Sequence, residues 1–218
     1  MHNMALPEND EDTDTAEVLS SIENLNAFHI RFARIVSIVL SPVTISLPFI
    51  TLVALYSHES NALLSALLTL FFLSVGPMIY ILIGVKTGKF SDVDVSMRSQ
   101  RTGPFLFSIA SSLLGFFVLS TIHGSKNLES VLLITVISGI ILMIITFWWK
   151  ISMHASSLSG AITVLSILYG KVVLPAFLLI ILVNWSRVVL RRHTIAQVTA
   201  GTLMSIALSW FLLTLRGV

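Results

Sequence analysis

The chain has 218 residues, of which 55% are hydrophobic and only 11% are charged. A soluble domain carries roughly a quarter charged residues, so much of this protein's surface must meet hydrocarbon instead of water. The formal net charge of +2 is too small to indicate a nucleic-acid partner. The absence of cysteine excludes disulfides, thiolate metal sites and cysteine nucleophiles. The composition therefore predicts a membrane protein.

The first 30 residues differ in character from the rest. Residues 1–17 (MHNMALPENDEDTDTAE) are acidic and almost free of large apolar side chains, which predicts a disordered tail. Residues 18–30 place apolar side chains at helical spacing. Two interpretations stay open for them: a short amphipathic helix on the membrane surface, or a helical lead-in to the first span. We expect one transmembrane domain over 31–218.

The remaining chain is dominated by long apolar runs. A helix needs about 20 apolar residues to cross the hydrocarbon core, and five runs satisfy this: 35–56, 62–85, 104–122, 129–149 and 194–215. A further run between His154 and Ser186 is interrupted at Gly170-Lys171, which suits two short spans, 154–170 and 172–186. Backbone groups in lipid must be hydrogen-bonded internally. The predicted fold is therefore all-α, a transmembrane helical bundle of six to seven spans, with a kink at Pro42 and Pro48 in the first.

The polar connections between these spans divide unequally between two faces. Ten of the 13 Lys and Arg fall on the face that carries the N-terminus, the loop 86–103, the turn 150–154 and the segment 186–193. Lys126, Lys171 and Arg216 fall on the other face. The positive-inside rule then places the N-terminus and the first face in the cytoplasm.

Three polar clusters converge on that first face: the loop 86–101, the segment 150–154 and the segment 186–201. Ionisable groups near or inside spans are costly to place and tend to mark functional sites. Any single cation there is better explained as a snorkelling anchor. Two histidines at helix starts, His154 and His193, each with a nearby serine and cation, favour a functional site.

In the third cluster, Ser186-Arg187 is followed after five residues by His193 and then by Val198 and Gly201. This arrangement resembles the third motif of the type 2 phosphatidic acid phosphatase superfamily, which also includes vanadium haloperoxidases. The second cluster is similar to that family's Pro-Ser-Gly-His motif. Ser152 and His154 are retained there, and Ile151 and Met153 replace Pro and Gly. The family's first motif is Lys, six residues, then Arg-Pro. Arg101 stands at its arginine, with Asp94 at the lysine position and Thr102 at the proline position.

The resemblance implies an integral membrane phosphatase that acts on a lipid phosphate or diphosphate without a metal cofactor. His193 would attack phosphorus and form a phosphohistidine, and His154 would protonate the leaving oxygen. The expected phosphate ligands are cations and hydroxyls from all three clusters: Arg187, Arg101, Ser152, Ser186, Lys150 and Arg98. Guanidinium groups suit phosphate because their planar fork donates paired hydrogen bonds.

Gln197 is the largest departure from the family pattern, which has Asp at this position to orient the nucleophilic histidine. A Gln carbonyl can still accept the Nδ1 hydrogen of His193, but it supplies no negative charge. An alternative prediction follows, in which the chain is a catalytically weakened protein that binds or transports a lipid phosphate.

Asp92 and Asp94 are spare carboxylates in a cation-rich loop. They suggest a further alternative, a Mg²⁺ site that carries a diphosphate in a prenyl- or phosphotransferase. They would equally serve to orient His193 from across the site, or to balance the neighbouring cations.

Overall fold

The computed structural model describes residues 27–57, 59 and 61–217. The tail predicted over 1–17 lies outside these residues, as does most of the segment 18–30. The described chain is helical throughout its regular structure, as predicted. In chain order its elements are the N-terminal helix Ala27–Val39, α2 (Pro42–Ser57), α3 (Ala62–Leu70), the π-helix η1 (Phe71–Val75), α4 (Gly76–Lys86), the 3₁₀ helix η2 (Arg98–Gln100), α5 (Thr102–Thr121), α6 (Lys126–Trp148), α7 (Met153–Tyr169), the 3₁₀ helix η3 (Gly170–Ala176), α8 (Phe177–Val189) and α9 (Ile195–Leu215).

Five helical segments are long and apolar enough to cross a membrane, by length and composition: Ala62–Lys86, Arg98–Thr121, Lys126–Trp148, Met153–Val189 and Ile195–Leu215. The N-terminal helix and α2 qualify together as a sixth, bent by 44°. The protein is therefore a multi-pass membrane protein with a helical-bundle fold.

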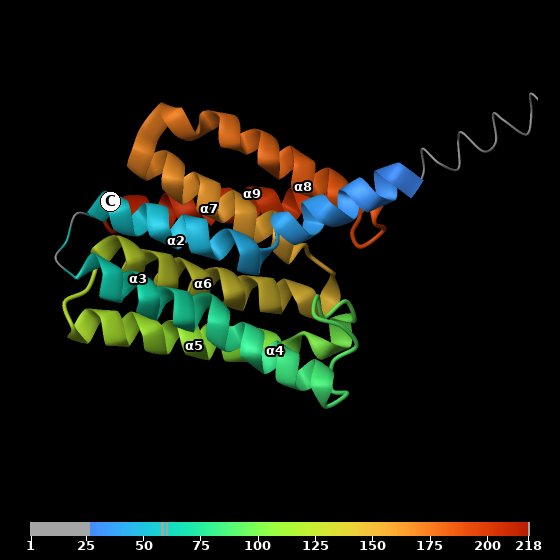
Figure 1. The fold of residues 1–218 in the computed structure, drawn as a ribbon, viewed down its shortest axis with the longest axis horizontal. Helices are drawn as coiled ribbons and strands as arrows, with labels where there is room; N and C mark the ends of the chain where they lie inside the picture. Colours follow the sequence, from blue (N-terminus) through green and yellow to red (C-terminus); the bar gives the residue numbers. More distant parts are fainter. Residues whose placement is uncertain (1–26, 58, 60, 218) are drawn as a thin grey trace, which may run out of the picture.

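The segment Met153–Val189 doubles back on itself (Figure 1). The reversal begins at Gly170, whose φ of +71° is a backbone conformation that suits glycine. Leu158 and Ile162 of α7 then pack against Ile180 and Val183 of α8, which makes the two helices antiparallel. The interruption at Gly170-Lys171 therefore marks a hairpin of two short arms, as the sequence indicates.

Two prolines lie in the second half of the first span. The bend before α2 lies at Leu40–Ser41, and Pro42 is the first residue of α2, where its missing N–H leaves no helical hydrogen bond unmade. Pro48 lies inside α2, which continues through it. Residues 27–30 belong to the N-terminal helix, so this part of the segment 18–30 is a helical lead-in to the first span.

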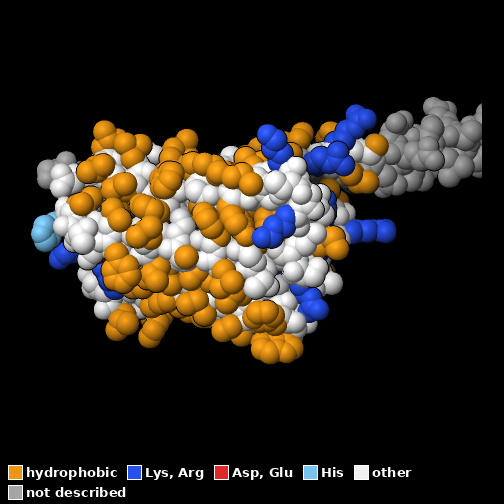
Figure 2. Space-filling view, turned by 90° about the horizontal axis from the view of Figure 1, so that it is seen from below, with side chains coloured by type: hydrophobic (Ala, Val, Ile, Leu, Met, Phe, Trp, Pro, Cys, Tyr) orange, Lys and Arg blue, Asp and Glu red, His pale blue; other side chains and the backbone are white. Residues whose placement is uncertain are grey.

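The connections between the helices lie at the two ends of the bundle (Figure 1). One end carries the N-terminal helix, the loop after α4, the α6–α7 turn and the α8–α9 turn. Figure 2 shows most of the visible Lys and Arg side chains at one end of the molecule, and hydrophobic side chains spread over its flanks. This is the distribution expected of a bundle surrounded by lipid. Which end faces the cytoplasm stays a prediction.

The largest core cluster lies towards the opposite end, where Leu119, Leu128 and Leu132 are fully buried. A smaller cluster of Phe105, Leu142 and Ile151 lies beneath the polar end. These apolar contacts hold the starts of α5 and α7 against the last turns of α6, and so position the polar groups above them.

Candidate functional site

The three polar clusters predicted from the sequence meet at one end of the bundle. Arg101, at the start of α5, donates a hydrogen bond from Nη1 to the carbonyl of Ile151, before α7, at 3.3 Å. Arg187, near the end of α8, donates from Nη1 to Oδ2 of Asp94, in the loop after α4, at 3.2 Å. These two arginines therefore join all three clusters into one site.

Arg187 is the most deeply buried cation of the site. Only 4% of its side chain is exposed, against 39% for its ion-pair partner Asp94. Nη1 also donates to Oγ of Ser37 at 2.7 Å. In the part of the chain that the structure describes, the buried Nε has no acceptor. A buried guanidinium N–H without an acceptor is costly, and an anion bound at this end of the bundle would remove that cost.

His193 lies in the turn between α8 and α9, and its neighbour Gln197 determines its tautomer. The N–H of Thr194 points at Oε1 of Gln197 at 3.1 Å, and because this group only donates, the amide oxygen must face it. The same oxygen lies 3.2 Å from Nδ1 of His193. Nδ1 must therefore carry the hydrogen, so Nε2 of a neutral His193 holds a free lone pair, as a nucleophile requires.

Gln197 has a second role in the local structure. Oγ1 of Thr194 accepts from the N–H of Gln197, and the Gln197 side chain accepts from the N–H of Thr194, which forms a capping box at the start of α9. The amide oxygen thus accepts two hydrogen bonds and contributes no charge.

The electrostatic surroundings keep His193 neutral. Burial, together with the positive charges of Arg187, Lys150 and Arg101, lowers the pKa of His193 to about 3, although the hydrogen bond to Gln197 acts in the opposite direction. Partial burial, followed by the charges of Arg101, Arg187 and Arg192, lowers the pKa of Lys150. These cations lie close enough to act on one another, which is the arrangement expected where an anionic ligand completes the charge balance.

His154 is the second residue of α7 and is buried. Gly201 of α9 lies directly behind this helix start, because a Cβ at position 201 would come within 2.9 Å of the Ser152 carbonyl oxygen. Only glycine allows α9 to approach α7 so closely. His154 therefore lies at the start of a helix that packs directly against α9, the helix that follows His193.

The two predicted serine ligands differ in what their hydroxyls can do. Oγ of Ser152 caps α7 by accepting from the N–H of Ala155 at 3.3 Å, so this hydrogen bond leaves its own hydrogen unused, although Ser152 is fully buried. Oγ of Ser186 donates its hydrogen to the carbonyl of Val183 at 2.7 Å. Ser186 is fully buried, and in this conformation it has no hydrogen left for a phosphate.

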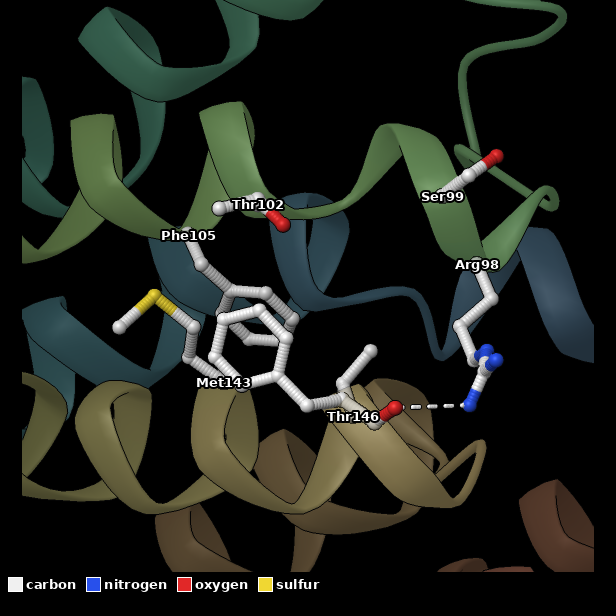
Figure 3. Close-up of a pocket in the computed structure, with 7 residues that line it drawn as sticks. Arg98, Ser99, Thr102, Phe105, Met143 and Thr146 are labelled. Atoms are coloured by element: carbon white, nitrogen blue, oxygen red, sulfur yellow. Dashed lines mark hydrogen bonds between the residues drawn. The ribbon is translucent and has the colours of Figure 1, made fainter.

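Arg98 is the predicted ligand that the structure does not bring into the cluster. Its Nη1 donates to the carbonyl of Phe147, at the end of α6, at 3.0 Å. Figure 3 shows Arg98 extending into a pocket between the start of α5 and the end of α6, and this pocket has a volume of about 180 Å³. An arginine at a helix C-terminus pairs with the negative end of the helix dipole, so its geometry is explained without a phosphate.

Asp92 and Asp94 have separate partners. Asp94 pairs with Arg187, whereas Asp92 accepts hydrogen bonds from Ser96 and Ser91 within its own loop. Partial burial would raise the pKa of Asp92, but these hydrogen bonds outweigh it and hold that pKa below its usual value. Residues 27–57, 59 and 61–217 contain no group of three or more His, Asp or Glu placed to hold a metal ion.

Sequence reasoning missed two residues of the site. Ser37 bonds Arg187 from the N-terminal helix, and Arg192 donates from Nη1 to Oγ of Ser96 at 2.6 Å. Ser37 lies in an apolar run, and nothing in the sequence distinguishes it from a serine that only packs between helices. Arg192 belongs to the third cluster, but nothing in the sequence indicates that Ser96 is its partner.

Comparison of the chain with family models, with curated proteins and with solved structures finds no match. The function therefore has to be inferred from the chemistry of the site itself.

Proposed function

We propose that this chain is an integral membrane phosphatase that hydrolyses a lipid phosphate or diphosphate through a phosphohistidine at His193. One observation carries the proposal. The buried guanidinium of Arg187 has an Nε without an acceptor among the described residues, in the same cluster as a neutral histidine with a free Nε2. A ligand that is both anionic and electrophilic suits this pair of groups, and a phosphate ester is such a ligand.

The proposed reaction has two steps. The Nε2 lone pair of His193 attacks phosphorus while the bond from phosphorus to the lipid oxygen breaks, and His154 gives that oxygen its proton. The negative charge of the bound phosphate favours the protonated form of His154 that this step requires. Water then attacks the phosphohistidine and loses a proton to His154, which releases inorganic phosphate and restores both residues. Arg187, Arg101 and Ser152 donate hydrogen bonds to the phosphate oxygens as charge develops.

A membrane setting favours a lipid as the substrate. The site lies at the end of a bundle whose flanks are apolar and exposed. A lipid can therefore place its phosphate headgroup at the site and its acyl chains alongside the helices.

One observation favours a second candidate function. Gln197 contributes no negative charge beside His193, and its carbonyl is shared with the α9 cap. In the serine-protease triad, loss of the equivalent carboxylate's charge lowers turnover about 10⁴-fold. We therefore keep the alternative that the site binds or transports a lipid phosphate without hydrolysing it.

The test is phosphate release by the purified full chain from a panel of lipid mono- and diphosphates, in the presence of EDTA. The variants are His193→Ala and, as a matched control, His29→Ala, which removes an exposed histidine of the N-terminal helix. Release that His193→Ala abolishes and His29→Ala retains supports the phosphatase. An acid-labile phosphoryl group on a peptide that contains residue 193, trapped by rapid denaturation, would identify the intermediate.

Two results would count against the phosphatase. No release from any substrate, with lipid phosphate still bound by both wild type and His193→Ala, would favour the binding or transport function. Release that occurs only with added Mg²⁺ would instead favour the magnesium-dependent transferase.

A further inference from the structure

Three arginines of the site are bound by one short stretch of chain, the loop 92–96. Oδ2 of Asp94 accepts from Nη1 of Arg187 at 3.2 Å. The carbonyl of Val95 accepts from Nε of Arg101 at 2.9 Å, and Oγ of Ser96 accepts from Nη1 of Arg192 at 2.6 Å. Three successive residues thus present three oxygen acceptors to three guanidinium groups, as the oxygens of a phosphate would.

The loop is held in a conformation that its sequence would not otherwise favour. Val95 has a φ of +45°, which is costly for a β-branched residue. Its N–H donates to the Asp92 carbonyl at 3.0 Å, and the Asp92 carboxylate accepts from the N–H and hydroxyl of Ser96. Asp92 therefore closes the turn and forms no ion pair among the described residues, whereas Asp94 pairs with Arg187.

The partners of the ion pair are unequally buried. Arg187 lies in the protein interior, whereas 39% of the Asp94 side chain is exposed. A carboxylate at the outer side of a buried guanidinium occupies the direction from which a ligand from solvent or from the lipid headgroup region would approach.

We infer that Asp94 is an internal competitor for the phosphate site, and that a phosphate group binds Arg187 by displacing the Asp94 carboxylate. The inference rests on the proposed phosphate site but not on turnover. Asp94 thereby determines how tightly the site holds phosphate, and it discriminates against weakly charged ligands. A phosphate dianion offers more negative charge and more acceptor oxygens than one carboxylate, whereas a carboxylate ligand offers no such advantage.

The experiment measures the Kd of inorganic phosphate for the full chain in detergent, by titration calorimetry. Asp94→Asn keeps the size of the side chain and removes its charge. Asp92→Asn removes the same charge two residues away and keeps an amide oxygen that can still accept the hydrogen bonds from Ser96, so that the turn is retained. We expect Asp94→Asn to bind phosphate roughly tenfold more tightly than wild type, because the competing charge-assisted contact is gone, and Asp92→Asn to change the Kd by less than about threefold.

Three results would overturn the inference. An unchanged or weaker affinity in Asp94→Asn would mean that Asp94 positions Arg187 instead of competing for it. Equally tighter phosphate binding in both variants would mean that the affinity depends on net charge and not on the contact between Asp94 and Arg187. An absence of phosphate binding by wild type and by Asp94→Asn alike would mean that these arginines do not form an anion site.

A second measurement does not depend on the Asp94 variants. Val95 is buried and the chain has no cysteine, so Val95→Cys gives one thiol whose labelling rate reports release of the loop. Phosphate should accelerate labelling at position 95, and a rate that is unchanged or slowed by phosphate would contradict displacement. Because neither readout involves hydrolysis, a chain that releases no phosphate from lipids would refute the phosphatase and leave this inference testable.

Discussion

Nη1 of Arg187 donates a hydrogen bond of 2.7 Å to Oγ of Ser37, a residue 150 positions earlier in the chain. This contact fastens the N-terminal helix to the end of α8 and holds the buried guanidinium in place at the centre of the site. The bend at Leu40–Ser41 directs the N-terminal helix so that Ser37 reaches Arg187. The irregularity of the first span therefore serves the site as well as the fold.

Ser37→Ala should destabilise the protein. Loss of a buried hydrogen bond to a charged group costs about 1.5–3 kcal/mol, and Arg187 would keep Asp94 as its partner. We expect a lower Tm for the variant in detergent, with unfolding measured by tryptophan fluorescence. Thr51→Ala is the control, because its hydroxyl bonds only to its own helix, at the Leu47 carbonyl. A Tm loss no larger than that of the control would contradict a structural role for Ser37.

The lowered pKa of His193 makes stability depend on pH. An unfolded histidine takes up a proton near pH 6.5, whereas folded His193 does so only at about 3. The contribution of neutral His193 to the free energy of unfolding is therefore fully present above pH 6.5. It is lost as the pH falls from 6.5 towards 3, by at most about 1.4 kcal/mol per pH unit. Thermal melts of wild type and His193→Gln between pH 7 and 4 should diverge, with the steeper loss in wild type. Parallel curves would show that His193 titrates normally.

Gln197→Glu should raise turnover if the chain is a phosphatase. Glu keeps the length of Gln and both of its hydrogen bonds, to Nδ1 of His193 and to the N–H of Thr194, and it adds the missing charge. Stabilisation of the imidazolium should increase kcat by at least about tenfold, a small part of the full carboxylate effect. The measurement is steady-state phosphate release, with Gln197→Leu as the variant that removes both charge and hydrogen bond. An unchanged kcat in Gln197→Glu would indicate that His193 is not the nucleophile.

Arg98 and Arg101 are three residues apart and should respond differently to the same substitution. Arg101 is buried against the Val95 and Ile151 carbonyls, whereas Arg98 bonds the end of α6. Arg101→Lys should weaken phosphate binding roughly tenfold through loss of the guanidinium fork, and Arg98→Lys should leave it within about twofold. Calorimetry with inorganic phosphate separates them. Equally weaker phosphate binding in the two variants would mean that Arg98 also belongs to the phosphate site.

The predicted orientation can be tested with single cysteines. Lys89 and Lys126 are both exposed and lie at opposite ends of the bundle. If the positive-inside rule holds here, a membrane-impermeant maleimide added to intact cells should label Lys126→Cys and not Lys89→Cys. The reverse pattern would place the site on the outer face.

The helical bundle, its spans and the hairpin at Gly170 follow directly from the sequence. Lipid-exposed helices need long apolar runs, and such a pattern is local, so it can be recognised without knowledge of the fold. The polar clusters at one end are also readable, because charges are confined to the connections between spans. The capping box of Thr194 and Gln197 is equally local, since its two residues are three positions apart.

Which of the clustered residues meet was decided by the tertiary structure alone. The pairing of Arg187 with Ser37 and Asp94 joins three elements distant in sequence, and the placement of Arg98 at the end of α6 depends on how α5 and α6 pack. The division of roles between Asp92 and Asp94 is also a tertiary property, because two carboxylates two residues apart have the same sequence signature. Helix periodicity determines which face of a helix a side chain occupies, but only the packing of helices against one another determines which partner it finds there.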